Sequence, residues 1–198
     1  METLALVGRT LGFSLAAGVN LYATVALIGL AARFGWVSLP PDFQAFGSFW
    51  VIGIAGALYC IEFIADKVPW VDTLWDAVHT FIRPIGGAAL AVAALGDASP
   101  SMKILAALLG GAVATSSHIT KAGTRVIANT SPEPFSNWGL SLLEDGFVVG
   151  LGLLALRYPL AALVVSLLVL SVIAVLAGML VSAFRRRFGA RASVATHQ

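Results

Sequence analysis

Residues 62–84 read EFIADKVPWVDTLWDAVHTFIRP, a run in which charged, polar and aromatic side chains interrupt an otherwise apolar chain. Of the 198 residues, 59% are hydrophobic and 11% are charged, and the mean hydropathy is +0.91. A soluble domain carries about 25% charged residues, so this chain has too few to cover a globular surface. The sequence therefore predicts an integral membrane protein and excludes disordered, collagen-like, coiled-coil and disulfide-rich classes.

Apolar runs of the roughly 20 residues that cross a hydrocarbon core recur along the chain. We expect an all-α, polytopic membrane bundle of about six transmembrane helices, at residues 4–32, 48–66, 72–95, 103–126, 138–156 and 159–183. Residues 1–184 would form a single transmembrane domain and residues 185–198 a basic tail. Each half has a helix that carries a glutamate, which suggests an internal repeat of three helices. An alternative pairing of shorter units would make the repeat parallel rather than inverted.

The basic tail predicts the topology. It contains Arg185, Arg186, Arg187 and Arg191. Basic residues beside a span favour the cytoplasmic side and contact anionic lipid headgroups. With six spans the N-terminus would share that side, together with the loops at 66–72 and 127–137. Membrane lipids are therefore expected partners and nucleic acid is not.

The predicted helix 72–95 contains a proline close to its middle. Pro84 follows Arg83 directly, and Gly86 and Gly87 come next, so we expect a kink or a break near Arg83 and Pro84. The remaining segment 85–95 covers only about 17 Å at 1.5 Å per residue and cannot span alone. In transporters such broken helices often frame the binding site.

The few charged residues are unevenly placed among the predicted spans. Ten of them gather on four span ends at the predicted cytoplasmic side, together with two histidines. At 100° per residue they form a polar stripe on each of the four helices. A charge at the middle of a membrane costs about 2.5–3.5 kcal/mol on the insertion scale, so these groups must face the bundle interior, water or one another.

Eleven residues of these stripes are the candidate binding site for a substrate or ion. They are Glu62, Asp66, Asp72, Asp76, His79, Arg83, His118, Lys121, Arg125, Glu144 and Asp145. Two interpretations follow from their signs. The bases Arg83, Lys121 and Arg125 could neutralise the carboxylates in a structural network, or the stripes could line a polar cavity that is open to the cytoplasm.

The leading functional hypothesis is a small transporter or channel-like protein for an ion or a small anionic solute. In that hypothesis His79 relays protons near neutral pH, and the three bases are counter-charges or contacts for an anion. The carboxylates that would hold a cation or a proton are Glu62, Asp66, Asp76 and Glu144. Two alternatives remain. One is a protein that binds or translocates an anionic lipid, and the other is a structural membrane protein that transports nothing.

Enzymatic and metal chemistry have weak support in the sequence. No two histidines stand at a metal-ligand spacing such as i, i+4, and only Ser116 and Ser117 beside His118 resemble a nucleophile and a base. We therefore expect no enzyme activity, metal site or cofactor. Glycines at four-residue spacing, such as Gly146 and Gly150, permit a homo-oligomer without requiring one.

Two stretches of the chain carry a family resemblance. They are Gly18-Val19-Asn20 through Ala31-Ala32-Arg33-Phe34-Gly35-Trp36, and Glu62 through Asp72 followed by Asp76. Over about residues 8–160 the chain resembles the bacterial membrane family of domain of unknown function 4126. Gly110 and Gly111, the segment Lys121 to Arg125, and Asn137, Ser141 and Glu144 extend the likeness. The resemblance implies a multi-span protein of the bacterial inner membrane and carries over no catalytic role.

Overall fold

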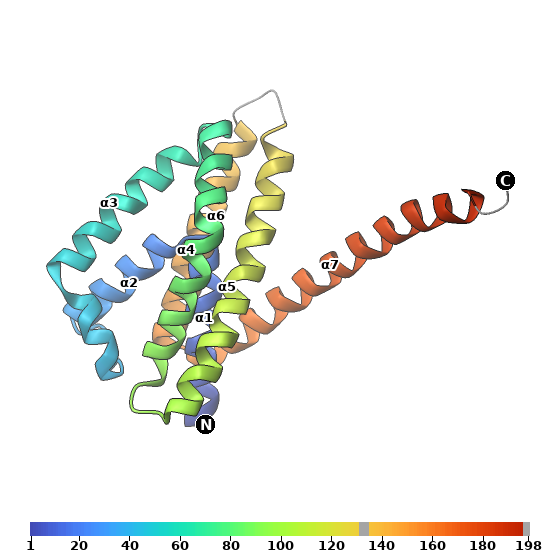
Figure 1. Cartoon of the computed structure of the whole chain (residues 1–198). Coiled ribbons are helices and arrows are strands. Elements are labelled where there is room, and N and C mark those ends of the chain that lie inside the picture. The colour runs from blue at the N-terminus through green and yellow to red at the C-terminus, as the bar shows by residue number, and fades with distance from the viewer. Residues whose placement is uncertain (131–134, 196–198) are drawn as a thin grey trace.

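The structure is a computed structural model, which describes residues 1–130 and 135–195, with side chains described as far as Arg185. In this part of the chain every regular element is a helix, as predicted. The elements are α1 (Glu2–Val19), α2 (Leu21–Arg33), η1 (Pro41–Gly47), α3 (Phe49–Ala65), α4 (Pro69–Leu95), α5 (Pro100–Ala128), α6 (Phe135–Arg157) and α7 (Pro159–Ala195). Helix α1 packs against α4, α5 and α6, and Figure 1 shows α4 and α5 side by side while α7 leaves the bundle.

Four helices, α4 to α7, are long and apolar enough to cross a membrane. The short helix η1 and α3 add a fifth crossing if they count as one span that is bent by 66°. The chain is thus a multi-pass helical membrane protein. The predicted count of six is not confirmed, and neither is the internal repeat.

The missing span is the first one, predicted at 4–32. This run breaks at Asn20, whose backbone is extended with φ −146° and ψ 100°. The Asn20 side chain caps α2 by accepting a hydrogen bond from the Ala23 amide at 2.9 Å, as expected of an N-cap residue. A break inside the membrane needs polar partners for the freed backbone groups, and Asn20 supplies one of them.

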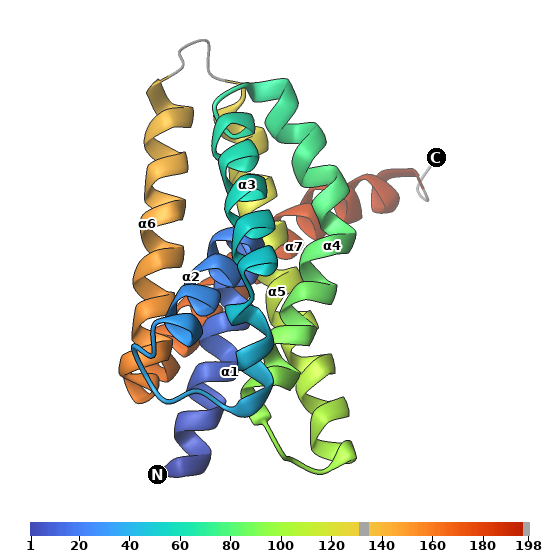
Figure 2. The same cartoon turned by 90° about the vertical axis from the view of Figure 1, so that its left-hand side faces the viewer.

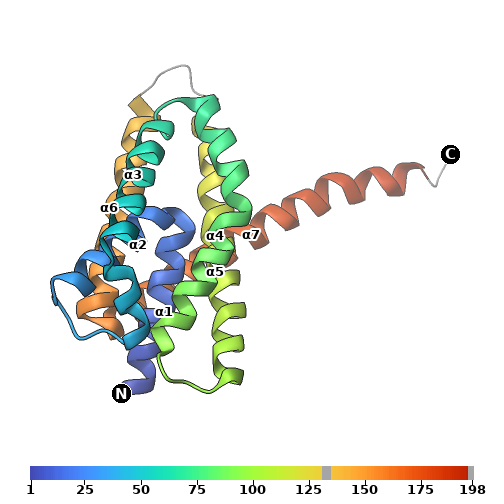
Figure 3. The ribbon, with the colours of Figure 1, turned by 60° about the vertical axis from the view of Figure 1, so that its left-hand side comes forward.

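Neither α1 nor α2 is among the helices that are long and apolar enough to cross a membrane, so we interpret the pair as a re-entrant hairpin. Met1 and Glu2 line a hollow with Arg157 and Tyr158, which end α6 and begin the turn after it. The segment 36–37 that follows α2 lines another hollow with the same two residues. The hairpin therefore begins and ends near the Arg157–Tyr158 end of α6. It turns at Asn20, and Figure 3 shows α1 running into the bundle and α2 turning away from it.

Helix α4 is not broken at Pro84. It runs as one helix from Pro69 to Leu95 with Pro84 inside it, and Figure 2 shows that it changes direction along its length. A single proline removes one amide donor, and close packing on α5 holds the rest of the helix. A Cβ atom at Gly87 would collide with Ala114 of α5, so the two helices are in near-backbone contact.

The hairpin also changes the predicted topology. In Figure 1 the N-terminus lies at the opposite end of the bundle from the α3–α4 turn and the end of α5. The N-terminus and the described parts of the loops at 66–72 and 127–137 therefore lie at opposite ends of the bundle. The predicted tail begins within α7, which continues as a helix through Ala195. Residues 131–134 and 196–198, parts of the predicted loop and tail, lie outside the described residues.

Small side chains let α1 sit in the middle of the bundle. Phe13, Leu15, Ala16 and Ala17 are fully buried, and a Cβ atom at Gly18 would collide with the Ser117 hydroxyl and the Ala114 carbonyl of α5. Association of helices in lipid depends on such close approach.

We expect Gly18→Ala to destabilise the protein by about 1–3 kcal/mol, because overpacking forces α1 away from α5. Gly146→Ala is the matched control, since nothing lies within 4 Å of a Cβ atom there. Thermal unfolding in detergent measures both variants. Equal melting temperatures for the two would contradict the close α1–α5 contact.

The re-entrant hairpin predicts which positions share a membrane side. In a Cys60→Ser background, Glu2→Cys and Asp97→Cys should react with a membrane-impermeant thiol reagent from one side, and Thr130→Cys from the other. All three side chains are exposed in the structure. Labelling of Glu2→Cys and Thr130→Cys from the same side would instead mean that residues 2–33 cross the membrane.

Candidate functional site

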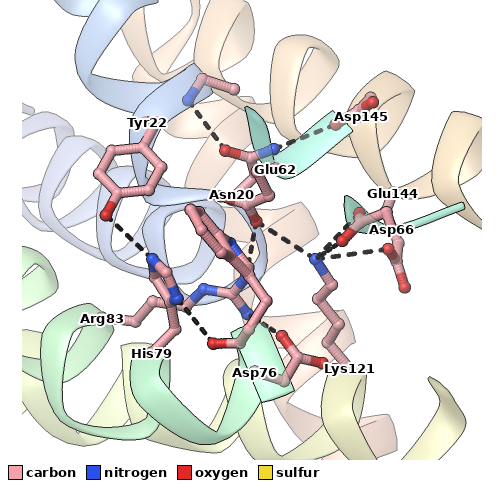
Figure 4. Close-up of polar contacts among 12 residues, drawn as sticks. Asn20, Tyr22, Glu62, Asp66, Asp76, His79, Arg83, Lys121, Glu144 and Asp145 are labelled. Atoms are coloured by element: carbon pink, nitrogen blue, oxygen red, sulfur yellow. Dashed lines mark hydrogen bonds and ion pairs between the residues drawn. The ribbon is translucent and has the colours of Figure 1, made fainter. Parts of the chain in front are cut away.

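The structure brings all eleven predicted site residues into one buried region among α3, α4, α5 and α6, as the close-up in Figure 4 shows for most of them. Ten are buried, and the Glu144 side chain is 11% exposed. Lys67, one of the ten charged residues at the predicted span ends, forms no ion pair within 4 Å among the described residues. Its ammonium lies over the Phe63 ring at 3.0 Å.

Arg83 of α4 is the centre of the first part of this network. Its Nη2 contacts Glu62 Oε1 of α3 at 2.6 Å, and its Nη1 lies 3.2 Å from Asp76 Oδ1. The same Nη1 reaches the Gly18 carbonyl, near the end of α1, at 3.4 Å. One fully buried guanidinium thus joins α3, α4 and the turn of the hairpin.

Arg83 also fixes the state of His118. Arg83 Nη1 lies 2.7 Å from His118 Nδ1, and because a guanidinium only donates, this ring nitrogen accepts. In the neutral ring Nε2 then carries the hydrogen and donates to Thr80 Oγ1 at 3.0 Å. Thr80 in turn donates to the Asp76 carbonyl at 3.0 Å.

The second part of the network ties α5 to the end of α3 and to α6. Arg125 Nη2 contacts Asp66 Oδ2 at 2.9 Å and Glu144 Oε2 at 2.6 Å. Lys121 Nζ lies between three carboxylates, at 3.3 Å from Glu62, 3.3 Å from Asp66 and 3.7 Å from Glu144. Lys121 therefore connects the two parts.

Two carboxylates and one histidine bind neutral groups that the sequence analysis did not include. Asp145 accepts hydrogen bonds from Asn20 Nδ2 at 3.2 Å and Tyr59 Oη at 3.3 Å. His79 contacts Tyr22 Oη at 2.9 Å and the Trp75 carbonyl at 2.7 Å. The carboxylate of Asp72 accepts a hydrogen bond from the Asn129 side chain at 3.0 Å. Separately, Arg125 donates a hydrogen bond to the main-chain carbonyl of Asp66 at 2.9 Å.

Asn20 had a signal in the sequence, because it is an amide in the middle of a long apolar run. The position of Trp75 near a predicted span end is typical of a tryptophan in the headgroup layer. In the structure its ring instead stacks on His79, with the ring centroids 4.6 Å apart. Arg83, Lys121 and Arg125 form ion pairs with Glu62, Asp66, Asp76 and Glu144. Asp145, another of the carboxylates that these bases could have neutralised, binds neutral partners instead.

The network holds more carboxylates than bases. Six carboxylates (Glu62, Asp66, Asp72, Asp76, Glu144 and Asp145) face three bases. Among the described residues, Asp72 and Asp145 form no ion pair, and the buried atoms Glu62 Oε2 and Asp76 Oδ2 have no hydrogen-bond partner. An uncompensated charge in such an interior costs several kcal/mol, so the region can take up positive charge.

The hollow beside the network is apolar, unlike the predicted polar cavity. It is a groove of about 490 Å³ between α5, α6 and α7, and Lys121 and Glu144 are the charged residues that line it. Over residues 1–130 and the described part beyond 135, no three His, Cys, Asp or Glu side chains are grouped so as to hold a metal ion.

A double-mutant cycle tests the pair at the centre of the network. Arg83→Gln should destabilise the protein by about 3–5 kcal/mol, because Glu62 and Asp76 keep their charges without their base. Adding Glu62→Gln should recover part of this loss, with a coupling energy of about 0.5–3 kcal/mol. Thermal or denaturant unfolding in detergent measures all four proteins.

The control cycle is Lys103→Gln with Asp42→Asn, a half-exposed pair at 3.5 Å. Exposed pairs couple by about 1 kcal/mol or less. Additive effects at Arg83 and Glu62 would show that the two charges do not depend on each other.

Among the comparisons of this chain with known proteins, one finds a match. No curated protein and no solved structure matches the chain. A family model does match, over residues 7–179, and its description is a domain of unknown function, DUF4126. Because this match covers most of the chain and the whole buried network, the protein is a member of the DUF4126 family.

Proposed function

We propose that this protein is a small membrane transporter in which the buried network binds and releases a proton or another small cation. The observation that carries the proposal is the excess of six carboxylates over three bases in one buried region. Intramembrane ionisable residues commonly mark ion pathways and proton relays. A proton or cation would offset the unpaired negative charge.

The charge balance favours a cation over the small anionic solute that the sequence also allowed. Each of the three bases already contacts at least two carboxylates. An anion would have to displace one of these carboxylates into an interior with too few positive charges. A cation needs no such exchange.

Lys121 gives the network a means of responding to positive charge. Its ammonium is shared by carboxylates of Glu62, Asp66 and Glu144 at 3.3–3.7 Å. When one of them is protonated, the lysine can shift to the other two without leaving the network. Such an exchange would alter how α5 is held against α3 and α6.

The turn of the hairpin lies next to this network. Arg83 contacts the Gly18 carbonyl, and Asn20 contacts Asp145. Interrupted helices of this kind often form transport sites, because their free backbone groups can bind an ion or a substrate. The hairpin is therefore the element that we expect to move when the network changes charge.

For the cellular location we propose the bacterial inner membrane, with the basic end of α7 in the cytoplasm by the positive-inside rule. The network then lies toward the cytoplasmic side. The N-terminus, at the opposite end of the bundle, would face away from the cytoplasm.

Charge displacement on a solid-supported membrane tests the transport proposal. We expect a pH jump to displace charge in vesicles that contain the protein, and we expect Asp76→Asn to abolish the signal, because the network then loses a carboxylate whose Oδ2 has no hydrogen-bond partner. Jumps of Na⁺ and K⁺ at constant pH show whether another cation replaces the proton.

Asp42→Asn is the control, since Asp42 lies outside the network with a half-exposed side chain. Its signal should equal that of the unaltered protein. Absence of any signal from correctly folded protein would overturn the proposal and leave the network with a purely structural role. An equal loss in Asp42→Asn and Asp76→Asn would also overturn it.

A further inference from the structure

The groove between α5, α6 and α7 joins the charged network to the surface of the bundle. Its outer rim includes Leu143 of α6 and Leu168 and Val172 of α7, and these side chains are 58–72% exposed. On a membrane protein, such apolar surface faces lipid. The groove volume of about 490 Å³ lies within the range of small-molecule sites, roughly 300–1,000 Å³.

The polar groups that line the groove are arranged to accept hydrogen bonds. The hydroxyl of Thr120 donates to the Ser116 carbonyl, and that of Thr124 donates to the Thr120 carbonyl, both at 2.8 Å. Their hydrogens are therefore engaged within α5, and their oxygen lone pairs remain free to accept. Glu144 adds the one carboxylate of the network that is part-exposed.

Lys121 does not make the groove attractive to an anion. Its Nζ is surrounded by Glu62, Asp66 and Glu144, and the Lys121 side chain is only 2% exposed. With six carboxylates against three bases behind it, the inner end of the groove is negative overall. Hydrogen-bond acceptors and negative charge together favour a positively charged group.

We propose that this groove binds a lipophilic cation, a molecule with an apolar body and one positive charge, which enters sideways from the lipid. The apolar walls take the body, and Glu144 with the two threonine hydroxyls takes the charge. This inference rests on the proposed transport function, because it names the cation that the network would exchange for a proton.

Two probes of nearly the same shape and opposite charge test the inference. Tetraphenylphosphonium should bind the purified protein saturably in neutral detergent, whereas tetraphenylborate should bind only by partition into the micelle. Equilibrium dialysis or calorimetry measures both. Equal binding of the two ions, or preference for the borate, would overturn the inference, and preference for the borate would favour an anionic amphiphile.

Two α7 variants locate the binding site. Val172→Trp places a large side chain in the groove, while Val175→Trp alters an equally exposed residue that does not line it. We expect Val172→Trp to weaken tetraphenylphosphonium binding by about tenfold or more, the loss of about 1.4 kcal/mol or more, and Val175→Trp to leave it unchanged. Equal effects of the two variants would show that tetraphenylphosphonium does not bind in this groove.

Glu144→Gln tests the charge itself, with thermal unfolding as the check that the variant folds. If Glu144→Gln does not fold, the Val172→Trp result still decides whether the phosphonium ion binds in the groove. The pH-driven charge displacement keeps this inference separate from the proposed function. A signal from the pH jump without saturable phosphonium binding would refute the groove inference alone, whereas saturable binding without any signal would refute transport alone.

Discussion

The guanidinium of Arg83 has no access to solvent, and its contacts reach three other segments of the chain: Glu62 of α3, His118 of α5 and the Gly18 carbonyl of α1. A charge at this depth is tolerated only if several partners surround it. That requirement sets the positions of α3 and of the hairpin turn relative to α4 and α5. The remaining ion pairs of Lys121 and Arg125 extend the same constraint to α6.

Much of the fold and of the candidate site could be predicted from the sequence. The cost of charge in lipid requires the polar stripes of four helices to face one another, and the structure gathers all eleven predicted residues. The hairpin could not be predicted in this way. The run 4–32 is apolar enough to read as one helix, and its break depends on partners such as Asp145, which is 125 residues away from Asn20 in the chain.

The outcome at Pro84 has the same origin. Local backbone chemistry predicts a kink or a break there; α4 changes direction along its length (Figure 2) but stays one helix, with Gly87 packed tightly against Ala114. Asn20 carries a weaker local signal, a single amide side chain within a long apolar run, yet its extended backbone ends α1. In both cases contacts between helices decide the outcome, and those contacts depend on the arrangement of the whole bundle. The groove also could not be predicted from the sequence, because it depends on how α7 leaves the bundle.

The hairpin turn at Asn20 constrains how the protein is assembled as it is made. Backbone that is not helical is tolerated at membrane depth only where protein or water satisfies it. Here Arg83 of α4 contacts the Gly18 carbonyl, and Asp145 of α6 contacts the Asn20 side chain. Both helices are synthesised after the hairpin, so these contacts can form only once most of the chain has been made.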